Sequence, residues 1–160
     1  MAIAGLILGY SGVALIPFIL IIAAIAIPNL LRARIAANQA SAVGSLRTLN
    51  VAAITYNSTY NQGYPPGIAA LGPPAGSATP DANAAGLIDE VLATGTKSGY
   101  VFTYSAGERD AQGRVQSYAI HADPIKPGNT GQNHYFTDQT GVIRQETDRP
   151  ANEQSPPIVR

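Results

Sequence analysis

The sequence predicts an α+β fold in which one long N-terminal helix packs on a small antiparallel β-sheet. Three observations support this prediction. The first 31 of the 160 residues contain no Asp, Glu, Lys or Arg. Apolar residues then recur at helical spacing as far as Tyr60, and segments rich in β-branched and aromatic residues follow after Gly99.

The uncharged segment, residues 1–31, is long enough to cross a bilayer, which requires about 20 residues. A secretory signal has a shorter apolar core of about 7–15 residues behind a basic start, and no basic start is present here. We therefore predict a retained membrane anchor, with a cleaved signal as the alternative. Arg32 and Arg34 follow the segment and would place this end toward the cytoplasm, unless residues upstream of Met1 reverse the topology.

Glycine and proline interrupt this segment at Gly9, Gly12, Pro17 and Pro28. A proline inside a helix removes a backbone donor, so a carbonyl at membrane depth needs another partner. Neighbouring helices or local rewinding can supply it, which favours packing against other helices. The alternative is a single-pass anchor with two tolerated kinks.

The second part of the predicted helix, residues 32–62, is amphipathic. Its apolar residues are spaced alternately four and three apart and form one stripe: Ala42, Leu46, Leu49, Ala53, Tyr56 and Tyr60. We expect four polar residues to point away from this stripe, namely Arg47, Asn50, Thr55 and Asn57. The stretch Leu20–Tyr60 is thus predicted as one helix that stops at "NQGYPPG", where Gly63 and two prolines follow.

Residues 63–146 are predicted to form a globular head. Residues 65–86 are expected to be mostly loop, with a turn at Ile68–Leu71. Asp81 or Asn83 could then cap a short helix that ends at Gly95 and has an apolar side made of Leu87, Ile88, Val91 and Leu92.

Strands are predicted in "GYVFTYSA", "RVQSYAIHA" and "HYFTDQTGVIRQ", the last being two strands joined by a turn at residues 138–141. Short connections between consecutive strands favour an antiparallel sheet. The helix should cover its apolar face through a helix–sheet contact of Leu46, Leu49, Ala53, Tyr56 and Tyr60, and most tyrosine rings should belong to this packing. The tail, residues 147–160, is expected to lie on the surface or be mobile.

Composition excludes several classes of function. Ten basic and ten acidic residues give a net charge of zero, which argues against nucleic acid as a partner. The absence of cysteine excludes disulfides, thiolate metal sites and cysteine nucleophiles. No Gly-x-Ser-x-Gly, His-Glu-x-x-His or P-loop motif is present, and His121 and His134 are interpreted as structural imidazoles. We therefore predict that the protein is not an enzyme.

The segment "IIAAIAIPNLLRARIAANQA", followed by an amphipathic helix, "GYP" at residues 63–65 and a small sheet, resembles the type IV pilin and type II secretion pseudopilin superfamily. The resemblance implies a pilin-like fold and a structural subunit of a helical homopolymer. Such a helix sits in the inner membrane before assembly and then stacks in the core of an extracellular or periplasmic filament, with an assembly or secretion machinery as partner. The role would be adhesion, motility or secretion.

The resemblance also implies which residues pack in a filament core. These are the apolar positions Ile19, Leu20, Ile22, Ala23, Ile25, Ala26, Ile27, Pro28 and Leu31. No cofactor is expected. Some pseudopilins bind calcium through loop carboxylates, which makes Asp123 and Asp138 weak calcium candidates here, although turn aspartates usually bond the local backbone.

The N-terminus departs from the family pattern. Counting back from Pro28 places the family's cleaved glycine at Leu6, its new N-terminus at Ile7 and its glutamate at Ser11, and the first acidic residue in the chain is Asp81. The sequence therefore leaves the native N-terminus, its processing and its N-methylation open, and an assembly signal would have to come from elsewhere. The alternative function is a monomeric, membrane-anchored binding or accessory protein with the same fold.

Overall fold

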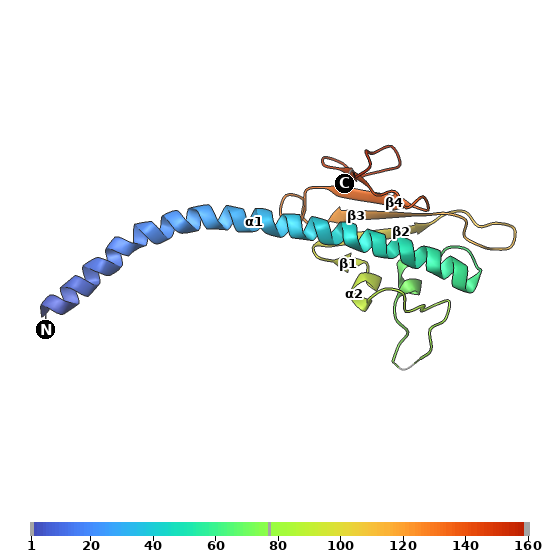
Figure 1. Ribbon diagram of the computed structural model, residues 1–160, viewed down its shortest axis with the longest axis horizontal. Helices are drawn as coiled ribbons and strands as arrows, with labels where there is room; N and C mark the ends of the chain where they lie inside the picture. The colour runs from blue at the N-terminus through green and yellow to red at the C-terminus, as the bar shows by residue number, and fades with distance from the viewer. Residues whose placement is uncertain (1, 77, 159–160) are drawn as a thin grey trace. The chain divides into compact units, whose positions relative to one another are not determined.

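The computed structural model describes residues 2–76 and 78–158, and it leaves out the side chains of residues 2–19 and of Ala23. The predicted α+β architecture is confirmed (Figure 1). Its elements are α1 (Ala2–Tyr60), the 3₁₀ helix η1 (Ile68–Leu71), α2 (Glu90–Ala93), β1 (Thr96–Lys97), β2 (Tyr100–Ala106), β3 (Tyr118–Pro124), β4 (His134–Asp138) and β5 (Arg144–Glu146).

The chain divides into two units, Met1–Arg34 and Ile35–Arg160, and the division falls within α1. We call Ile35–Arg160 the folded unit. Helix α1 is assigned without interruption through Pro17 and Pro28. It ends at Tyr60, as predicted from the "NQGYPPG" segment that follows.

The left-handed residue that ends α1 is Asn61, with a φ of 53°, and its backbone N–H donates to Asn57 O. Asparagine tolerates this conformation better than most residues. Gly63 has a different role. A Cβ added there would lie 2.3 Å from Val115 O, so only glycine allows the chain after α1 to approach Val115 this closely.

The sheet contains five antiparallel strands in the order β1-β2-β3-β4-β5. The central pairing joins β2 to β3 over seven residue pairs, and Ala119 to Ala122 of β3 pair with β4. The predicted turn at residues 138–141 is present, because Asp138 accepts hydrogen bonds from the backbone N–H groups of Thr140 and Gly141. The two-residue strand β1 is too short to leave a sequence pattern, and the sequence did not predict it.

The predicted short helix after Asp81 is wrong in its extent. The structure places a helix only at α2, where the Asp89 side chain accepts from Leu92 N, while Asp81 instead closes a local turn. Leu87 and Ile88 lie outside any helix, and both donate backbone hydrogen bonds to Leu71 O. Pairing with the segment at η1 thus satisfies the backbone groups that a longer helix would have used.

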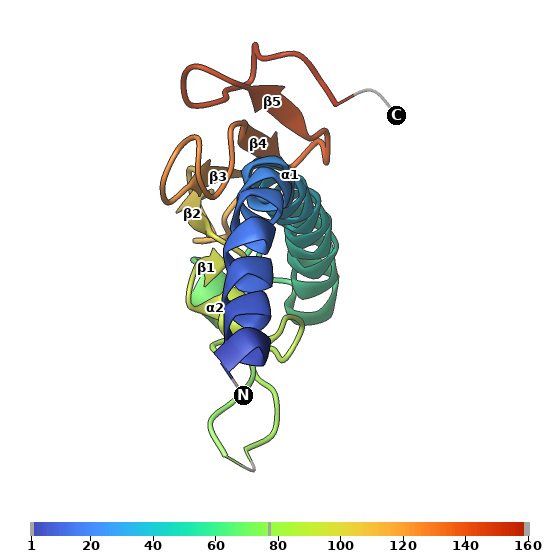
Figure 2. The same cartoon turned by 90° about the vertical axis from the view of Figure 1, so that its left-hand side faces the viewer.

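Helix α1 covers one face of the sheet along residues 35–60, and Figures 1 and 2 show this part of the helix lying over the strands and running along them. The predicted stripe is buried as expected: Ala42, Leu46, Leu49 and Ala53 are at most 1% exposed, Tyr56 is buried and Tyr60 is half-buried. These residues join sheet residues such as Tyr100, Phe102 and Ile120 in one hydrophobic core.

The expectation that Asn50 points away from the stripe is wrong. Asn50 is only 6% exposed, and its side chain donates to Thr137 Oγ1 and accepts from the Tyr118 hydroxyl. Asn50 lies four residues after Leu46, which places it on the buried face of the helix. Because both of its partners are on the sheet, the amide is satisfied without reaching solvent. Arg47 is exposed as expected, and the remaining two polar positions are half-buried.

The tail after β5 is packed on the folded unit. Ala151 and Ser155 are buried, and the Ser155 hydroxyl contacts Glu146. Further along, Ile158 N donates to Ile143 O. The tail therefore lies on the surface with fixed contacts to the last strand and to the turn before it.

The tyrosine rings pack between helix and sheet as expected, and two of them provide a matched pair for substitution. Tyr104 and Tyr118 stack with ring centroids 5.6 Å apart. The Tyr118 hydroxyl bonds Asn50, whereas the buried Tyr104 hydroxyl has no hydrogen-bond partner among the described residues.

We expect Tyr118→Phe to destabilise the folded unit by about 1–2 kcal/mol and Tyr104→Phe to be neutral or stabilising. Both changes remove one hydroxyl from the same stack, but only the first leaves a partner unsatisfied. Urea unfolding followed by tyrosine near-UV circular dichroism measures the two differences. Equal destabilisation by both variants would contradict the assigned hydrogen bond.

Burial also raises tyrosine pKa values, which predicts a loss of stability in alkali. Desolvation, with smaller contributions from Tyr64 and Asp138, raises the pKa of Tyr118 to about 12, and burial raises the pKa of Tyr104 further. Tyrosines of the unfolded chain titrate near about 10, so above this pH the unfolded state loses protons that the folded state retains. The contribution of these tyrosines to stability should be constant up to about pH 9 and fall as the pH rises through about 10 to 12. Urea midpoints across this range, with tyrosinate absorbance recorded in parallel, measure the effect.

Candidate functional site

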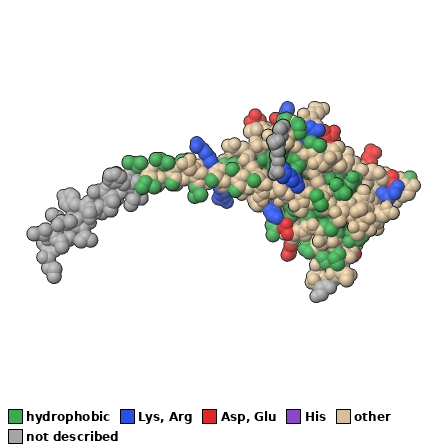
Figure 3. Space-filling model, viewed as in Figure 1, with side chains coloured by type: hydrophobic (Ala, Val, Ile, Leu, Met, Phe, Trp, Pro, Cys, Tyr) green, Lys and Arg blue, Asp and Glu red, His purple; other side chains and the backbone are tan. Residues whose placement is uncertain are grey.

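The main candidate site is an apolar surface on α1, formed by residues 20–31, which we call the apolar segment. Large aliphatic side chains lie exposed on all sides of this helix, at Leu20, Ile21, Ile22, Ile25, Ile27, Leu30 and Leu31. The least exposed of them, Leu31, is still 40% exposed, and the most exposed, Leu30, is 71% exposed. Figure 3 shows these hydrophobic side chains as the green atoms along the described part of the helix before the first arginines.

A helix that is apolar all round is normally buried in a membrane or in a protein core. Isolated exposed leucines are common on protein surfaces, but a continuous apolar surface of this kind marks an interaction site. The apolar segment therefore requires a cover, which can be lipid or protein.

The structure places the predicted filament-core residues on this surface. Leu20, Ile22, Ile25, Ile27 and Leu31 are exposed large aliphatic residues, and Ala26 and Pro28 are also exposed. The predicted Ile19 and Ala23 lie outside the described side chains. The sequence prediction omitted Ile21 and Leu30, although both lie in the uncharged run that would have identified them.

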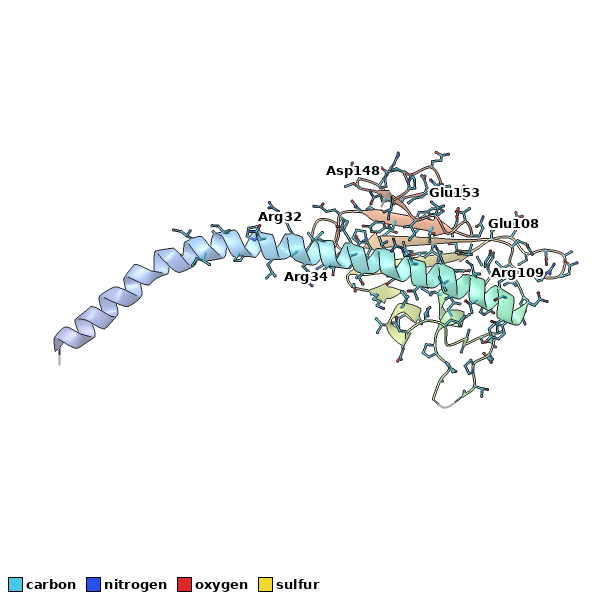
Figure 4. The ribbon with its side chains drawn as sticks, in the orientation of Figure 1. Arg32, Arg34, Glu108, Arg109, Asp148 and Glu153 are labelled. Atoms are coloured by element: carbon cyan, nitrogen blue, oxygen red, sulfur yellow. The ribbon has the colours of Figure 1, made fainter. Side chains whose placement is uncertain are left out.

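Two arginines follow the apolar segment. Arg32 and Arg34 are exposed and project to opposite sides of α1 (Figure 4), as expected for two residues about 200° apart on a helix. None of the ion pairs among the described residues involves either of them. Exposed cations at the end of an apolar helix are typical of a membrane boundary, where they remain in the headgroup region.

Among the described residues, α1 is the one helix long and apolar enough to cross a membrane, over Leu20–Tyr60. Burial of the helix begins at Ile35, the first residue of the folded unit, which is 8% exposed. The change from an exposed apolar helix to a helix with one buried face thus occurs between Leu31 and Ile35, at the arginines.

The two weak calcium candidates are not brought together. Asp138 pairs with Ala119, four residues from Asp123 along β3. Asp123 contacts the His134 ring, and Asp138 accepts from Thr140 in its turn. No group of three or more His, Asp or Glu side chains with metal-binding geometry occurs among the described residues.

The histidines have structural contacts. His121 packs edge-on against Phe136, with ring centroids 5.1 Å apart, and His134 contacts Asp123 on the adjacent strand. The register places these residues on the face of the sheet away from α1. Neither imidazole contacts a serine or threonine hydroxyl among the described hydrogen bonds.

A second candidate site is a polar cleft at the end of α1, which the sequence did not predict. It has a volume of about 390 Å³ and is lined by segments far apart in the chain, including Tyr56, Asn61, Tyr64, Asn83, Arg109 and Arg114. No local sequence pattern connects these residues, because the fold brings them together.

Comparisons of the chain with protein-family models, curated proteins and solved structures gave no match.

Proposed function

We propose that this protein is a structural subunit of a filament of the type IV pilus or type II secretion pseudopilus kind, which polymerises through its N-terminal helix. The observation that carries the proposal is the apolar segment, a helix exposed on all sides that precedes a separately folded unit in the chain. A long apolar helix packed on an antiparallel sheet is compatible with the pilin-like fold that the sequence resembles.

Burial of the apolar segment is energetically favourable in two successive environments, lipid and then a helix bundle. Burying one large aliphatic side chain contributes about 1.5–3 kcal/mol, so seven such residues provide on the order of 10 kcal/mol. Lipid provides this burial before assembly. Copies of the same helix provide it afterwards, because identical apolar helices can pack around one another once they leave the bilayer.

Filament formation requires that each copy contact the next through two different surfaces, since such contacts continue without closing into a ring or dimer. An apolar helix without a single preferred face suits this requirement. Its side chains can contact several neighbours at once, and the folded units then form the outer coat. The location would be the inner membrane for the unassembled subunit and an extracellular or periplasmic filament after assembly.

A monomeric, membrane-anchored binding or accessory protein is the second candidate. The lack of any acidic residue before Asp81 favours it, because the glutamate that family members use in assembly has no counterpart. The two candidates share the membrane-bound state. They differ in whether copies of the apolar segment contact one another in the final state.

Electron microscopy of the full chain tests the proposal. Purified in mild detergent and then freed of detergent by dialysis, the protein should form thin fibres of uniform diameter, and sheared cell-surface material should contain the same fibres. Mass spectrometry of the first peptide of the fibre subunit would define its N-terminus and any methyl group. A protein that stays monomeric in detergent, gives amorphous precipitate on dialysis and forms no fibres on cells would support the membrane-anchored alternative.

A further inference from the structure

The polar cleft at the end of α1 has the properties of a ligand site, and it lies entirely within the folded unit. Its volume of about 390 Å³ falls in the range of small-molecule pockets, roughly 300–1,000 Å³. Three walls line it: the end of α1 with residues 61–66, the turn at residues 109–115, and the loop at residues 82–83. Arg109 in Figure 4 marks this turn beside the end of the helix.

The first wall is fixed by the close approach of residues 63–64 to Val115. Tyr64 N donates to Val115 O at 2.9 Å, and Gly63 leaves no room for a side chain between the two segments. The Tyr64 ring packs edge-on against Tyr118 in the core, with ring centroids 4.8 Å apart. Tyr64 therefore lines the cleft, and its ring is fixed by packing against Tyr118.

The second wall is a turn held together by Asp110. Its carboxylate accepts from the backbone N–H groups of Gln112 and Arg114 and from the side chains of Arg114 and Gln116. Partial burial opposes ionisation, but the hydrogen bonds from Arg114 and Gln112 hold the pKa of Asp110 below its ordinary value. The carboxylate is thus ionised at neutral pH and used within its own turn.

The third wall is held in the same way by Asp81. This carboxylate accepts from Asn83 N and Ala84 N, at 2.8 and 2.9 Å. The Tyr56 hydroxyl donates to Ala82 O and ties the wall to α1. All three walls are therefore fixed by contacts of the chain itself, so little conformational entropy would be lost when a ligand binds.

The cleft contains two arginines: Arg114 forms an ion pair with Asp110, whereas Arg109 belongs to none of the ion pairs among the described residues. Its described lining contains Arg109 and Arg114 but no Asp or Glu. Arg109 uses Nη1 to bond Gly113 O, and Arg114 uses Nε to bond Asp110. Each guanidinium keeps further N–H donors, which can bind a planar anion in the two-pronged geometry that arginine favours.

The uncharged residues of the lining indicate which other chemical groups the ligand has. Four side-chain amides line the cleft, at Asn61, Gln62, Asn83 and Gln112. Amides donate and accept hydrogen bonds, which suits hydroxyl groups, and a tyrosine ring packs against the C–H face of a sugar. A simple inorganic anion would use the arginines alone.

We propose that this cleft binds a saccharide that carries a carboxylate, such as a uronic acid residue, with Arg109 and Arg114 on the carboxylate and the amides on the hydroxyls. The inference goes beyond filament assembly. It also holds for a membrane-anchored monomer, since every residue of the site belongs to the folded unit.

The test is a calorimetric or NMR titration of the full chain in a detergent without sugar, such as lauryldimethylamine oxide. Trigalacturonic acid is the probe, maltotriose is the neutral control and inorganic phosphate is the simple-anion control. We expect saturable binding of trigalacturonic acid below about 10 mM, weakening with salt, and no saturation with the other two. Equal binding of maltotriose, or of phosphate, would overturn the assignment.

Substitutions locate the binding within the protein. Arg109→Gln should weaken trigalacturonic acid binding by about tenfold or more, because it removes a charge-assisted contact. Arg149→Gln is the matched control, since Arg149 is an exposed arginine outside the cleft with one ion pair, to Glu146. Arg109→Lys, which keeps the charge and loses the planar fork, should give an intermediate affinity.

The folded state of each variant is checked by its melting temperature, so a loss of binding is not confused with unfolding. Binding that is absent in the wild type, or unchanged in folded Arg109→Gln, would refute the cleft assignment. Fibre formation is recorded on the same preparations. Because it depends on the apolar segment, its failure would refute the filament proposal and leave the saccharide proposal to be decided by the titration.

Discussion

Leu46→Asp unfolds the folded unit. Leu46 is fully buried at the centre of the helix stripe that faces the sheet. Truncating a core leucine alone costs about 2–5 kcal/mol, and an unpaired carboxylate adds several more. The sum is comparable with the total stability of an ordinary domain, about 5–15 kcal/mol, so the variant should have no folded population at room temperature.

Near-UV circular dichroism is the suitable measurement for this variant. The chain has no tryptophan, and seven of its eight tyrosines are in the folded unit, so the aromatic signal reports its packing. Far-UV signal alone would mislead, because the apolar segment can stay helical in detergent after the folded unit is lost.

Val51→Asp is the matched control for Leu46→Asp. Val51 lies on the same helix, but its side chain is 65% exposed, so the carboxylate stays in water. Its effect should be within about 0.5 kcal/mol. Leu46→Met, a nearly volume-conserving change, should cost less than about 1.5 kcal/mol. A normal melting transition for Leu46→Asp would contradict the helix–sheet core described here.

The stripe that contains Leu46 could be predicted because one helix face repeats with a period that sequence spacing reveals. The same reasoning failed at Asn50, since it assumed that a polar residue avoids the buried face. Asn50 is buried because Thr137 and Tyr118, more than 60 residues away, supply its hydrogen-bond partners. Hydrogen-bond partners on the sheet cannot be recognised from the residues near Asn50 in the sequence.

The short helix predicted after Asp81 shows that the spacing of apolar residues does not determine secondary structure either. Leu87, Ile88 and Leu92 are compatible with one helix face, but the first two donate to Leu71 O instead. The pairing of two segments about 17 residues apart replaced local helix formation. Short apolar runs do not distinguish between these outcomes, because both bury the same side chains.

The two candidate sites differ in how far the sequence predicts them. The apolar segment follows from composition alone, since 31 residues without charge require a nonaqueous surrounding. The polar cleft depends on three loops that meet only in the folded state, and its arginines resemble ordinary surface residues in the sequence. Because Asp110 follows Arg109 in the sequence, the two residues would be expected to form an ion pair. In the structure the Asp110 carboxylate instead accepts hydrogen bonds from the side chain and the backbone N–H of Arg114.

Ile25→Asp should abolish fibre formation and leave the folded unit intact. Ile25 is 61% exposed on the apolar segment, outside the folded unit, so the melting temperature of that unit should not change. In a fibre, however, the same position would be surrounded by other apolar helices. The nearest basic side chain of the same chain is Arg32, seven residues or about 10 Å along the helix, which is too far to pair with a carboxylate there.

The free-energy cost of this carboxylate is repeated in every subunit. An unpaired carboxylate in a dry helix bundle costs several kcal/mol, whereas one at the centre of a bilayer costs about 2.5–3.5 kcal/mol on insertion scales. A single subunit in detergent avoids most of this cost, because water and detergent headgroups can reach the side chain. The variant should therefore purify as a folded, detergent-bound monomer and fail only when copies must pack together.

Ile25→Leu separates the effect of charge from that of shape. It keeps the volume and the apolar character, so fibres should form at a yield close to that of the wild type. Carbonate extraction of membranes shows whether Ile25→Asp is still inserted, and dialysis from detergent tests assembly independently of insertion. Fibres of normal yield from Ile25→Asp in that dialysis would mean that residue 25 is not enclosed by neighbouring helices. The apolar segment would then serve as a membrane anchor, because a bilayer can accommodate one aspartate by local thinning and water entry, while a close-packed helical core cannot.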